Sequence, residues 1–230
     1  MSAPSPATRF RFVGGPRRPA PGGPVPPEDG DLVWFTDDGE LTIGLRPIHP
    51  NDKPALLAGF ERLSDESRYQ RFLAPMERLT SRQVRYLTEV DHVNHFAWAA
   101  GIRSVDGEEI GVGVARYVRH SDDPSAAEAA VVVADDFRQR GIGTLLVEAL
   151  LEVAHDRDIA EITAFMFAEN AAAVRIFERL GSAISPDSPG VLCARLRLPA
   201  PGGTGIDPAG REELLWVACI AAHPSHSPCR

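Results

Sequence analysis

Residues 128–181 read EAAVVVADDFRQRGIGTLLVEALLEVAHDRDIAEITAFMFAENAAAVRIFERLG, and the order of elements in this stretch decides the fold. The apolar run Ala127–Val133 is typical of a buried strand. It leads into the turn 138–144, whose glycines permit a tight passage from strand to helix. From Gly143 to about Asp156 the apolar residues recur on one face, which predicts an amphipathic helix.

The second half of the stretch repeats this order of strand and helix. Ile162–Phe167 reads as a strand, and Asn170 is a residue type that caps the N-termini of helices. The helix that follows is expected to end at Leu180, with Gly181 in the C-terminal capping position.

Further elements flank this stretch on both sides. Asp106-Gly107 is typical of a hairpin turn, and Thr80 is expected to cap a helix. Because strands and helices alternate along the chain, the pattern predicts an α/β fold, with helices on both faces of one mixed sheet. We expect strands at 41–46, 96–103, 110–118 and 191–198, and helices at about 52–63, 67–72 and 80–90.

Both ends of the chain differ in composition from the middle. Residues 1–30 are dense in Pro, Gly and Ala, and such a segment buries too little apolar surface to order itself, so we expect a disordered tail. Residues 31–198 are expected to form the folded domain. Residues 199–230 are expected to be poorly ordered, apart from one apolar run, Leu214–Ala222, that suits a short helix or strand.

The bulk composition narrows the class of protein. The 230 residues carry a formal net charge of −8, which argues against a nucleic-acid partner. An acidic surface attracts amine-bearing molecules, although a merely solvated surface gives the same charge. The 3 cysteines form no close pair, which predicts neither a disulfide framework nor a zinc site and favours a reduced, cytoplasmic setting. We expect no membrane segment and no secretory signal, and a monomer or a homodimer.

The turn Arg138–Thr144 has the features of an anion-binding site. The first turn of a helix presents backbone N–H groups without intrahelical partners, and the helix dipole adds to their attraction for phosphate. Glycine allows phosphate to approach the backbone, Thr144 adds a hydroxyl group, and Arg138 or Arg140 adds positive charge. A glycine-bearing turn without a ligand would have the same sequence. The Gly-Lys-Ser/Thr of a P-loop and the third glycine of a dinucleotide fingerprint are both absent.

Two motifs resemble the GNAT superfamily of acetyl-CoA-dependent N-acetyltransferases. Arg138, Gly141 and Gly143 match the family's turn Q/R-x-x-G-x-G/A, and residues 170–181 match its later motif N-x-x-A-x-x-x-Y-x-x-x-G except at one position. The resemblance covers about residues 41–198 and implies a mixed, mostly antiparallel sheet with helices on both faces. It also implies acetyl-CoA as co-substrate, no metal, and contacts to the coenzyme from Val131, Val132, Val133, Arg138, Gln139, Arg140, Gly141, Ile142, Gly143, Thr144, Asn170 and Phe177.

A narrower resemblance concerns the acceptor. Thr42–Asp52, Ser64–Phe72 and Ala127–Asp135 are similar to the GNAT domain of bacterial protein lysine acetyltransferases, which implies a protein lysine as the acceptor. That group often carries an additional regulatory or acyl-CoA-synthetase-like domain, and we carry over no regulation of that kind. Two alternatives stay open: an enzyme that acetylates a small-molecule amine, and an acyl-CoA sensor without catalysis.

Glu128 is the candidate general base. Strand alternation places Glu128, Ala130 and Val132 on one face of their strand, and an acid in such an apolar strand is uncommon unless it is exposed or used. The related protein acetyltransferases have a glutamate at this position, which implies that it removes the proton of the acceptor amine. An exposed glutamate at a strand edge is the alternative interpretation.

Backbone groups are expected to complete the site. In GNAT proteins this strand is bulged and diverges from the next strand, Ile162–Phe167, which implies that an N–H group of Val131 or Val132 polarises the thioester carbonyl. Their side chains are expected to lie in the core. Asn170 serves both as a helix cap and as a contact to the pantetheine arm.

One position departs from the family pattern. Phe177 stands where many GNAT enzymes have a tyrosine that protonates the leaving thiolate, so the thiolate leaves unaided or water protonates it. His92 and His95 lack partners at metal-binding spacing, and we expect no metal there. The helix at 67–72, with Arg68, Tyr69, Arg71 and Phe72, is expected to cover the acceptor side, by packing or by contact with the acceptor.

Overall fold

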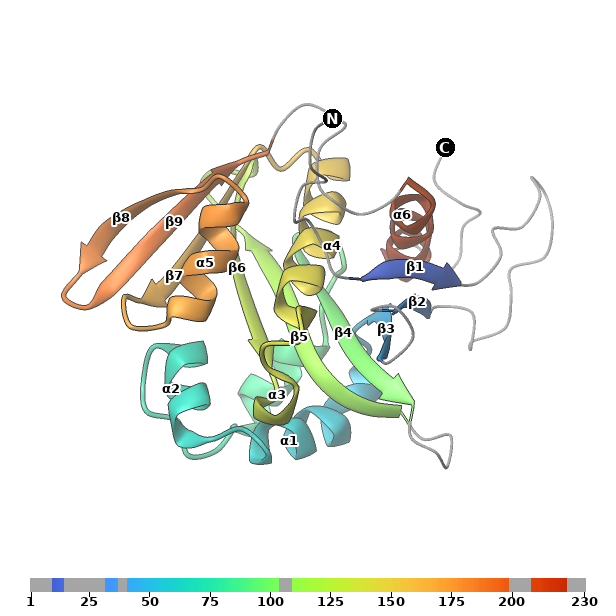
Figure 1. Ribbon diagram of the computed structural model, residues 1–230, viewed down its shortest axis with the longest axis horizontal. Helices are drawn as coiled ribbons and strands as arrows, with labels where there is room; N and C mark the ends of the chain where they lie inside the picture. The colour runs from blue at the N-terminus through green and yellow to red at the C-terminus, as the bar shows by residue number, and fades with distance from the viewer. Residues whose placement is uncertain (1–9, 15–31, 37–40, 104–108, 199–207, 223–230) are drawn as a thin grey trace, which may run out of the picture.

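The computed structural model describes residues 10–14, 32–36, 41–103, 109–198 and 208–222, and its centre is a single sheet (Figure 1). The strand order is β1-β2-β3-β4-β5-β6-β7-β9-β8. Strands β6 and β7 are parallel and all other neighbours are antiparallel, so the expected mixed, mostly antiparallel sheet is confirmed. The strands are β1 (Arg11–Gly14), β2 (Val33–Thr36), β3 (Thr42–Pro47), β4 (His95–Arg103), β5 (Glu109–Arg119), β6 (Ala126–Val133), β7 (Glu161–Phe167), β8 (Ala183–Ser188) and β9 (Val191–Arg197).

Helices cover both faces of this sheet (Figure 1). The even-numbered side chains of β6 face the side of α1, α2 and α3, where Glu128 and Val132 border cavities. The odd-numbered side chains face α4, and Val133 packs close to Gly143 at the start of that helix. The helices are α1 (Lys53–Glu61), α2 (Asp65–Phe72), α3 (Ser81–Thr88), α4 (Ile142–Asp156), α5 (Ala171–Arg179) and α6 (Pro208–Ala222), with short 3-10 turns at Pro50–Asp52 and Asp135–Phe137.

Local sequence signals set the helix ends. The Thr80 hydroxyl accepts from the backbone N–H of Gln83, and the Asn170 side chain accepts from the N–H of Ala173, so both expected caps are confirmed. Gly181 has a φ of 80°, which glycine adopts without steric cost at a helix C-terminus. Asp106-Gly107, the expected hairpin turn, lies outside the described residues.

Side chains of α4 form the centre of the core. Leu145, Leu146 and Leu150 are completely buried against the sheet. Trp98 of β4 is also completely buried, and its indole Nε1 donates to the backbone oxygen of Ala149 at 3.2 Å. The apolar stripe of the expected amphipathic helix therefore joins α4 to the middle of the sheet.

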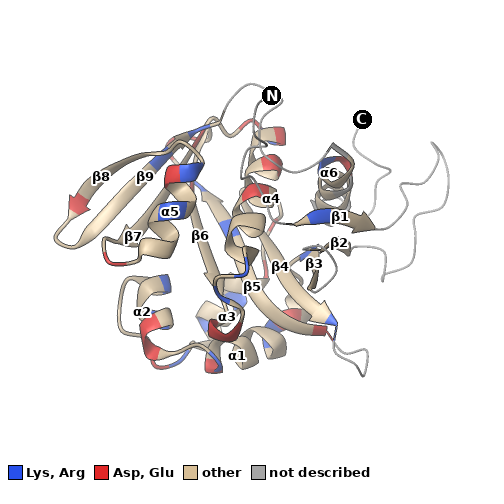
Figure 2. Ribbon diagram, in the orientation of Figure 1, with Lys and Arg blue, Asp and Glu red and all other residues tan. Residues whose placement is uncertain are grey.

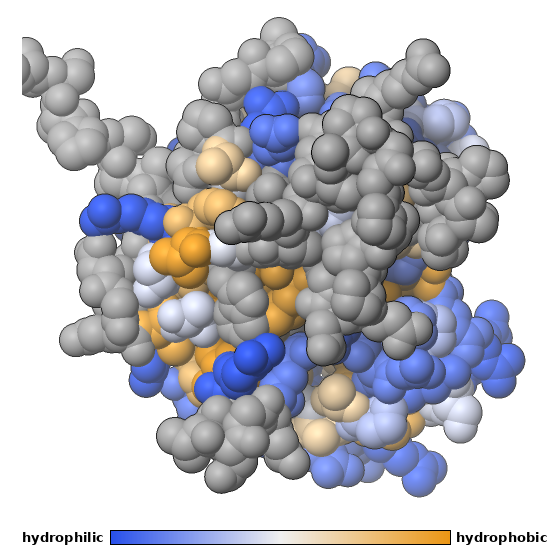
Figure 3. All heavy atoms as spheres, turned by 90° about the vertical axis from the view of Figure 1, so that its right-hand side faces the viewer, coloured by the Kyte–Doolittle hydropathy of each residue, from blue (hydrophilic) through white to orange (hydrophobic). Residues whose placement is uncertain are grey.

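One described element, β1, lies in a segment for which disorder was expected, and another, α6, contains the apolar run Leu214–Ala222 for which a short helix or strand was expected. Residues 11–14 pair with β2 as the edge strand β1, and residues 208–222 form α6. Leu214 and Val217 of α6 are completely buried, because an apolar helix lowers its free energy by packing on the core. The division of the chain at residues 30 and 198 stays a prediction, but these two segments are ordered elements. Figure 3 looks onto this edge of the molecule, where apolar surface is visible and Val13 is 55% exposed.

Two of the cysteines have different environments. Cys193 is a buried free thiol in β9, whereas Cys219 on α6 is disulfide-bonded. The expectation of reduced cysteines therefore does not hold for Cys219. Within the described part of the chain, we find no helix that is long and apolar enough to cross a membrane.

Charged residues join α6 to α4. Figure 2 shows acidic positions along α4 and a basic position on the neighbouring α6. Glu152 is 2% exposed and pairs with the Arg211 guanidinium at 2.5 Å. Glu148, one turn earlier, is 4% exposed, and burial together with the charge of Glu152 raises the pKa of the Glu148 carboxyl to about 7.

This buried carboxyl makes the stability of the fold depend on pH. Since the ordinary pKa is 4.5, the folded state binds more protons than the unfolded state between pH 4.5 and pH 7, so the free energy of unfolding falls as pH rises through that window. We expect Glu148→Gln to remove this loss, which amounts to about 3 kcal/mol at most. Denaturant unfolding at pH 4 and pH 8 measures the difference between variant and wild type.

The exposed Asp158, just after the same helix, provides the control. Asp158→Asn should leave the pH dependence of unfolding unchanged, and asparagine tolerates the positive φ of 58° at this position. A Glu148→Gln effect of equal size at both pH values would contradict the raised pKa.

Candidate active site

Strands β6 and β7 diverge, and the opening between them forms part of the candidate active site. Parallel pairing joins Ala126 to Glu161, Ala127 to Ile162 and Glu128 to Thr163, and then stops although both strands continue. The expected divergence of the two strands is therefore confirmed. Residues 129–133 keep an edge that faces β7 without being paired to it, and such an edge can accept an extended ligand.

The register of β6 shows which backbone groups point into this opening. His120 N–H donates to Ala126 oxygen and Ala134 N–H donates to Val112 oxygen, so the even-numbered residues of β6 bond to β5. The pairing with β5 runs from 127 to 133 without a register shift, and the expected bulge is not present in this pairing. The odd-numbered residues must therefore direct their backbone groups towards β7.

The alternation of hydrogen bonds between odd- and even-numbered residues of β6 corrects one expectation. The N–H groups of Val131 and Val133 face the opening, whereas the N–H group of Val132 faces β5 and is not available to a ligand there. The side chains of Val131 and Val133 pack against the core, as expected. Val132 instead borders a cavity with its side chain.

The turn before α4 has the geometry of an anion site. Gly141 is the N-cap residue, with a φ of 86°, and no side chain caps the helix. The first helical hydrogen bond runs from Leu145 N–H to Gly141 oxygen at 3.0 Å, so the N–H groups of the first turn point out of the helix. Gln139 also has a positive φ of 60°. These N–H groups and the helix dipole favour an anion at this end of α4.

The arginines of the turn have different partners. Arg138 pairs with Asp135 at 3.1 Å and donates to the Ser67 hydroxyl at 2.6 Å, which ties the turn to α2. Burial acts to raise the pKa of Asp135, but hydrogen bonds from Ser67 and Ser64 and the charge of Arg138 lower it overall. Arg140 is exposed, and its guanidinium lies 5.6 Å from the centre of the Phe137 ring. Of the two, Arg140 is therefore the one without an anionic partner in the described residues.

The remaining expected coenzyme contacts differ in exposure. Thr144, Gly143 and Asn170 are partly exposed, Ile142 is buried and Gln139 is exposed. Phe177 is 3% exposed and belongs to the hydrophobic core, so its ring offers almost no surface to a ligand. A tyrosine hydroxyl is absent at this position and the phenyl ring packs in its place.

Glu128 lies on the open side of β6, at the edge of a cavity of about 610 Å³. The carboxylate is exposed, and Ala130, two residues further along the strand, borders the same cavity. The shared face of Glu128, Ala130 and Val132 is thus confirmed. Arg71 of α2 is close enough for the Glu128 charge to act on its guanidinium.

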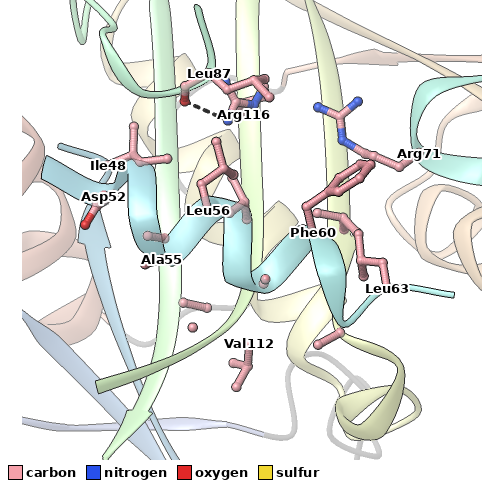
Figure 4. Close-up of a pocket in the computed structure, with 18 of the residues that line it drawn as sticks. Ile48, Asp52, Ala55, Leu56, Phe60, Leu63, Arg71, Leu87, Val112 and Arg116 are labelled. Carbon is pink, nitrogen blue, oxygen red and sulfur yellow. Dashed lines mark hydrogen bonds between the residues drawn. The ribbon is translucent and has the colours of Figure 1, made fainter. Parts of the chain in front are cut away.

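A second, mostly apolar cavity of about 170 Å³ lies between α1 and the sheet (Figure 4). Val132 and Val112 border it from the sheet, and Leu56 and Phe60 border it from α1. Four residues border both cavities, namely Arg71, Phe72, Leu87 and Arg116. The two cavities are therefore neighbours that meet at two arginines.

The α2 helix has mainly packing contacts. Arg68 donates to the backbone oxygens of Phe60 and Glu61. The Tyr69 ring stacks on Phe167 of β7 at 4.5 Å, so α2 lies beside the open end of the β6–β7 gap. Packing therefore explains Arg68, while Arg71 faces the cavities.

His92 and His95 lie in different environments. His92 is 9% exposed and its ring packs edge-on against Phe96. His95 Nε2 lies 2.9 Å from the Arg116 guanidinium, and burial together with that charge lowers the pKa of His95 to about 4. Among the residues that the structure describes, no group of three or more His, Cys, Asp or Glu side chains lies together.

The sequence analysis missed Arg116 and Asp135. Arg116 stands in the apolar alternation of β5 as Glu128 does in β6, and the same signal would have identified it. Asp135 joins Ser64, Ser67 and Arg138, but partners about seventy residues away leave no local signal in the sequence.

The comparison with known families agrees with this geometry. The model of the acetyltransferase (GNAT) domain matches residues 42–183. The chain belongs to this GNAT family. It is therefore a member of a family of acetyltransferases, with the two motifs and the parted strands in the positions that the family resemblance implied.

Two of the named relatives are acetyltransferases. The chain is 30% identical over 176 residues to Acetyltransferase Pat of Mycolicibacterium smegmatis, covering 76% of this chain and 49% of that protein. It is 28% identical to Acetyltransferase PA5475 of Pseudomonas aeruginosa, covering 63% of this chain and 76% of that protein. The chain thus spans about half the length of the M. smegmatis relative.

Solved structures show the same fold. The crystal structure of the GNAT domain of S. lividans PAT aligns with a TM-score of 0.63 and 30% identity, over 70% of this chain and 93% of that one. A cAMP-binding acyltransferase from Mycobacterium smegmatis aligns with a TM-score of 0.60 and 25% identity, over 83% of this chain and 55% of that one.

Gly141 provides a test of the anion site. We expect Gly141→Val to weaken acetyl-CoA binding by at least about a hundredfold, because loss of charge-assisted hydrogen bonds costs about 2–3 kcal/mol. Isothermal titration calorimetry measures the dissociation constant. The control is Gly190→Val in the β8–β9 turn, where φ is 78° and a Cβ meets no neighbour. Equal affinity in the two variants would count against the anion site.

Proposed function

We propose that this protein transfers the acetyl group of acetyl-CoA to a primary amine, with a protein lysine as the leading acceptor and Glu128 as general base. The observation that carries the proposal is the arrangement of one strand. Strand β6 presents the N–H groups of Val131 and Val133 to the opening between β6 and β7, and it carries the Glu128 carboxylate at the edge of a cavity. The candidate anion-binding turn follows this strand in the chain.

Coenzyme recognition is divided between the turn and the strand. The N–H groups at the start of α4 would hold the pyrophosphate, with Arg140 as the nearby free cation. The backbone groups of Val131 and Val133 that face the opening would form hydrogen bonds with the pantetheine amides, so that the pantetheine arm lies along β6 like an added strand. Gly143 allows the start of α4 to pack closely on α5, since a Cβ there would lie 3.2 Å from Ile176 Cδ1.

The chemistry needs an amine without its proton and a polarised carbonyl. Acetyl-CoA supplies the acyl group as an activated thioester. The Val131 N–H group faces the opening and suits the carbonyl oxygen, on which negative charge develops. Glu128 accepts a proton from the acceptor ammonium. The two residues are three positions apart, or about 10 Å along the strand, so one water molecule can relay the proton.

Support for a protein acceptor comes from the relatives. Acetyltransferase Pat of M. smegmatis and the PAT of S. lividans share 30% identity with this chain. A small-molecule amine is the second candidate, and it is favoured by the small, mostly apolar cavity of about 170 Å³ beside Val132. An acyl-CoA sensor would keep the anion-binding turn without needing Glu128.

Replacement of Glu128 separates catalysis from sensing. We expect Glu128→Gln to lower the rate of acetyl transfer by about a hundredfold or more, because the general base is lost, while acetyl-CoA affinity stays the same. Labelled acetyl-CoA, incubated with unfractionated bacterial extract, measures transfer to proteins and to small molecules in the same experiment.

The matched control is Asp122→Asn, which removes a carboxylate from the wall of the same cavity. We expect that variant to keep its transfer rate to within about threefold, since it leaves the base in place. If Glu128→Gln transfers label as fast as Asp122→Asn, Glu128 is not the base.

A further inference from the structure

Arg116 is a buried cation with an unused donor. It stands in the middle of β5 and is 4% exposed. One terminal nitrogen donates to Leu87 oxygen at 3.1 Å and the other lies 2.9 Å from His95 Nε2, but the buried Nε has no partner. Burial, and then the charge of Arg71, lower the pKa of Arg116 to about 9.

Arg71 is the second cation of this site. It borders both cavities, and among the described residues its guanidinium makes no hydrogen bond or ion pair. Its carbon centre lies 5.0 Å from the Phe72 ring. Burial lowers the pKa of Arg71 to about 10, and the charge of Glu128 acts in the opposite direction. Figure 4 shows Arg71 and Arg116 at the same end of the apolar cavity, coming from α2 and β5.

The strand register places this arginine pair beside the expected reaction centre. Arg116 is paired with Ala130, between the pairs Val114–Val132 and Val118–Glu128. Side chains two residues apart on one strand lie about 7 Å apart on the same face, so Arg116 stands between the levels of Glu128 and Val132. Because Ala130 has only a methyl group, space remains beside the guanidinium.

A buried cation, Arg116, beside a partly buried one, Arg71, is unfavourable without an anion. The larger cavity is also bordered by Arg119, His120 and Asp122, so its cationic side chains outnumber its carboxylates. The charge of Glu128 acts on Arg71, but no ion pair joins the two among the described residues. A carboxylate of a ligand would bond to the free donors of Arg71, and its charge would lower the cost of holding both arginines close together.

We propose that Arg71 and Arg116 form a carboxylate-binding subsite, so that the acceptor carries a carboxylate close to its reacting amine. The inference rests on the proposed acetyl transfer, whose acceptor class it narrows. The amine is directed to Glu128 and the carboxylate to the arginine pair. The carboxylate has two possible sources: a free amino acid, or an Asp or Glu residue next to the target lysine in a peptide.

Two matched pairs of acceptors test this subsite. Lysine and cadaverine differ only in the carboxylate, and the capped peptides Gly-Lys-Asp and Gly-Lys-Asn differ only in the charge of the neighbouring side chain. The ratio of kcat/KM within each pair is measured with acetyl-CoA. The same four compounds are titrated into protein saturated with coenzyme A, and their dissociation constants need no transfer. Failure of transfer with a preserved binding preference would therefore count against the proposed function alone.

In at least one pair, the wild-type protein should favour the member with the carboxylate by about tenfold or more in kcat/KM or in affinity. The pair that shows this preference identifies the source of the carboxylate, either a free amino acid or an acidic residue next to the lysine. Arg71→Gln should reduce this ratio to below about threefold, and Arg71→Lys should keep most of it. The control Arg82→Gln removes an exposed charge from the neighbouring α3 and should change nothing. A ratio near one in both pairs, or a ratio that survives Arg71→Gln, would overturn the subsite.

Discussion

Strand β6 loses its parallel partner after Glu128, and an unpaired strand edge must bond to water or to a ligand. The opening beside β6 and the N–H groups that face it depend on this single break in the sheet, which begins just after the proposed base, Glu128. The antiparallel pairing with β5 stays intact along the same residues, so β6 is held rigidly on one side and open on the other. A rigid strand with an open edge can orient an extended ligand without further ordering of the backbone.

Beside this opening, the odd- and even-numbered side chains of β6 form two faces with different roles. The odd-numbered side chains anchor the strand to α4, whose first turn is the candidate anion site, so the groups proposed to bind the coenzyme belong to one packed unit. The even-numbered side chains face α1–α3 and the two cavities, where Glu128 and the arginine pair lie. Alternation along one strand thus separates a structural face from a chemical face.

Much of this arrangement could be predicted from the sequence, because it depends on local signals. The apolar run 127–133, the glycine turn and the caps at Thr80 and Asn170 gave the strand, the helices and their ends, and the structure agrees. What could not be predicted depends on contacts between distant segments. Which residues of β6 direct their N–H groups to the opening depends on the register with β5, and this register turns the N–H group of Val132 away from a ligand. The bond from Asp135 to Ser67 and the burial of α6 on the core are likewise long-range. The apolar run Leu214–Ala222 predicted a short helix or strand, but its sequence does not reveal where on the core that element packs.

Hydrogen exchange of individual backbone amides tests the central claim most directly. The amides of Ala130 and Val132 bond to β5, so they should exchange slowly with or without acetyl-CoA. The amides of Val131 and Val133 face the open edge, so they should exchange faster in the free protein and slow by about tenfold or more when acetyl-CoA is bound. If bound acetyl-CoA leaves these two amides unchanged, β6 is not the strand that pairs with the coenzyme, and the account of the site is wrong.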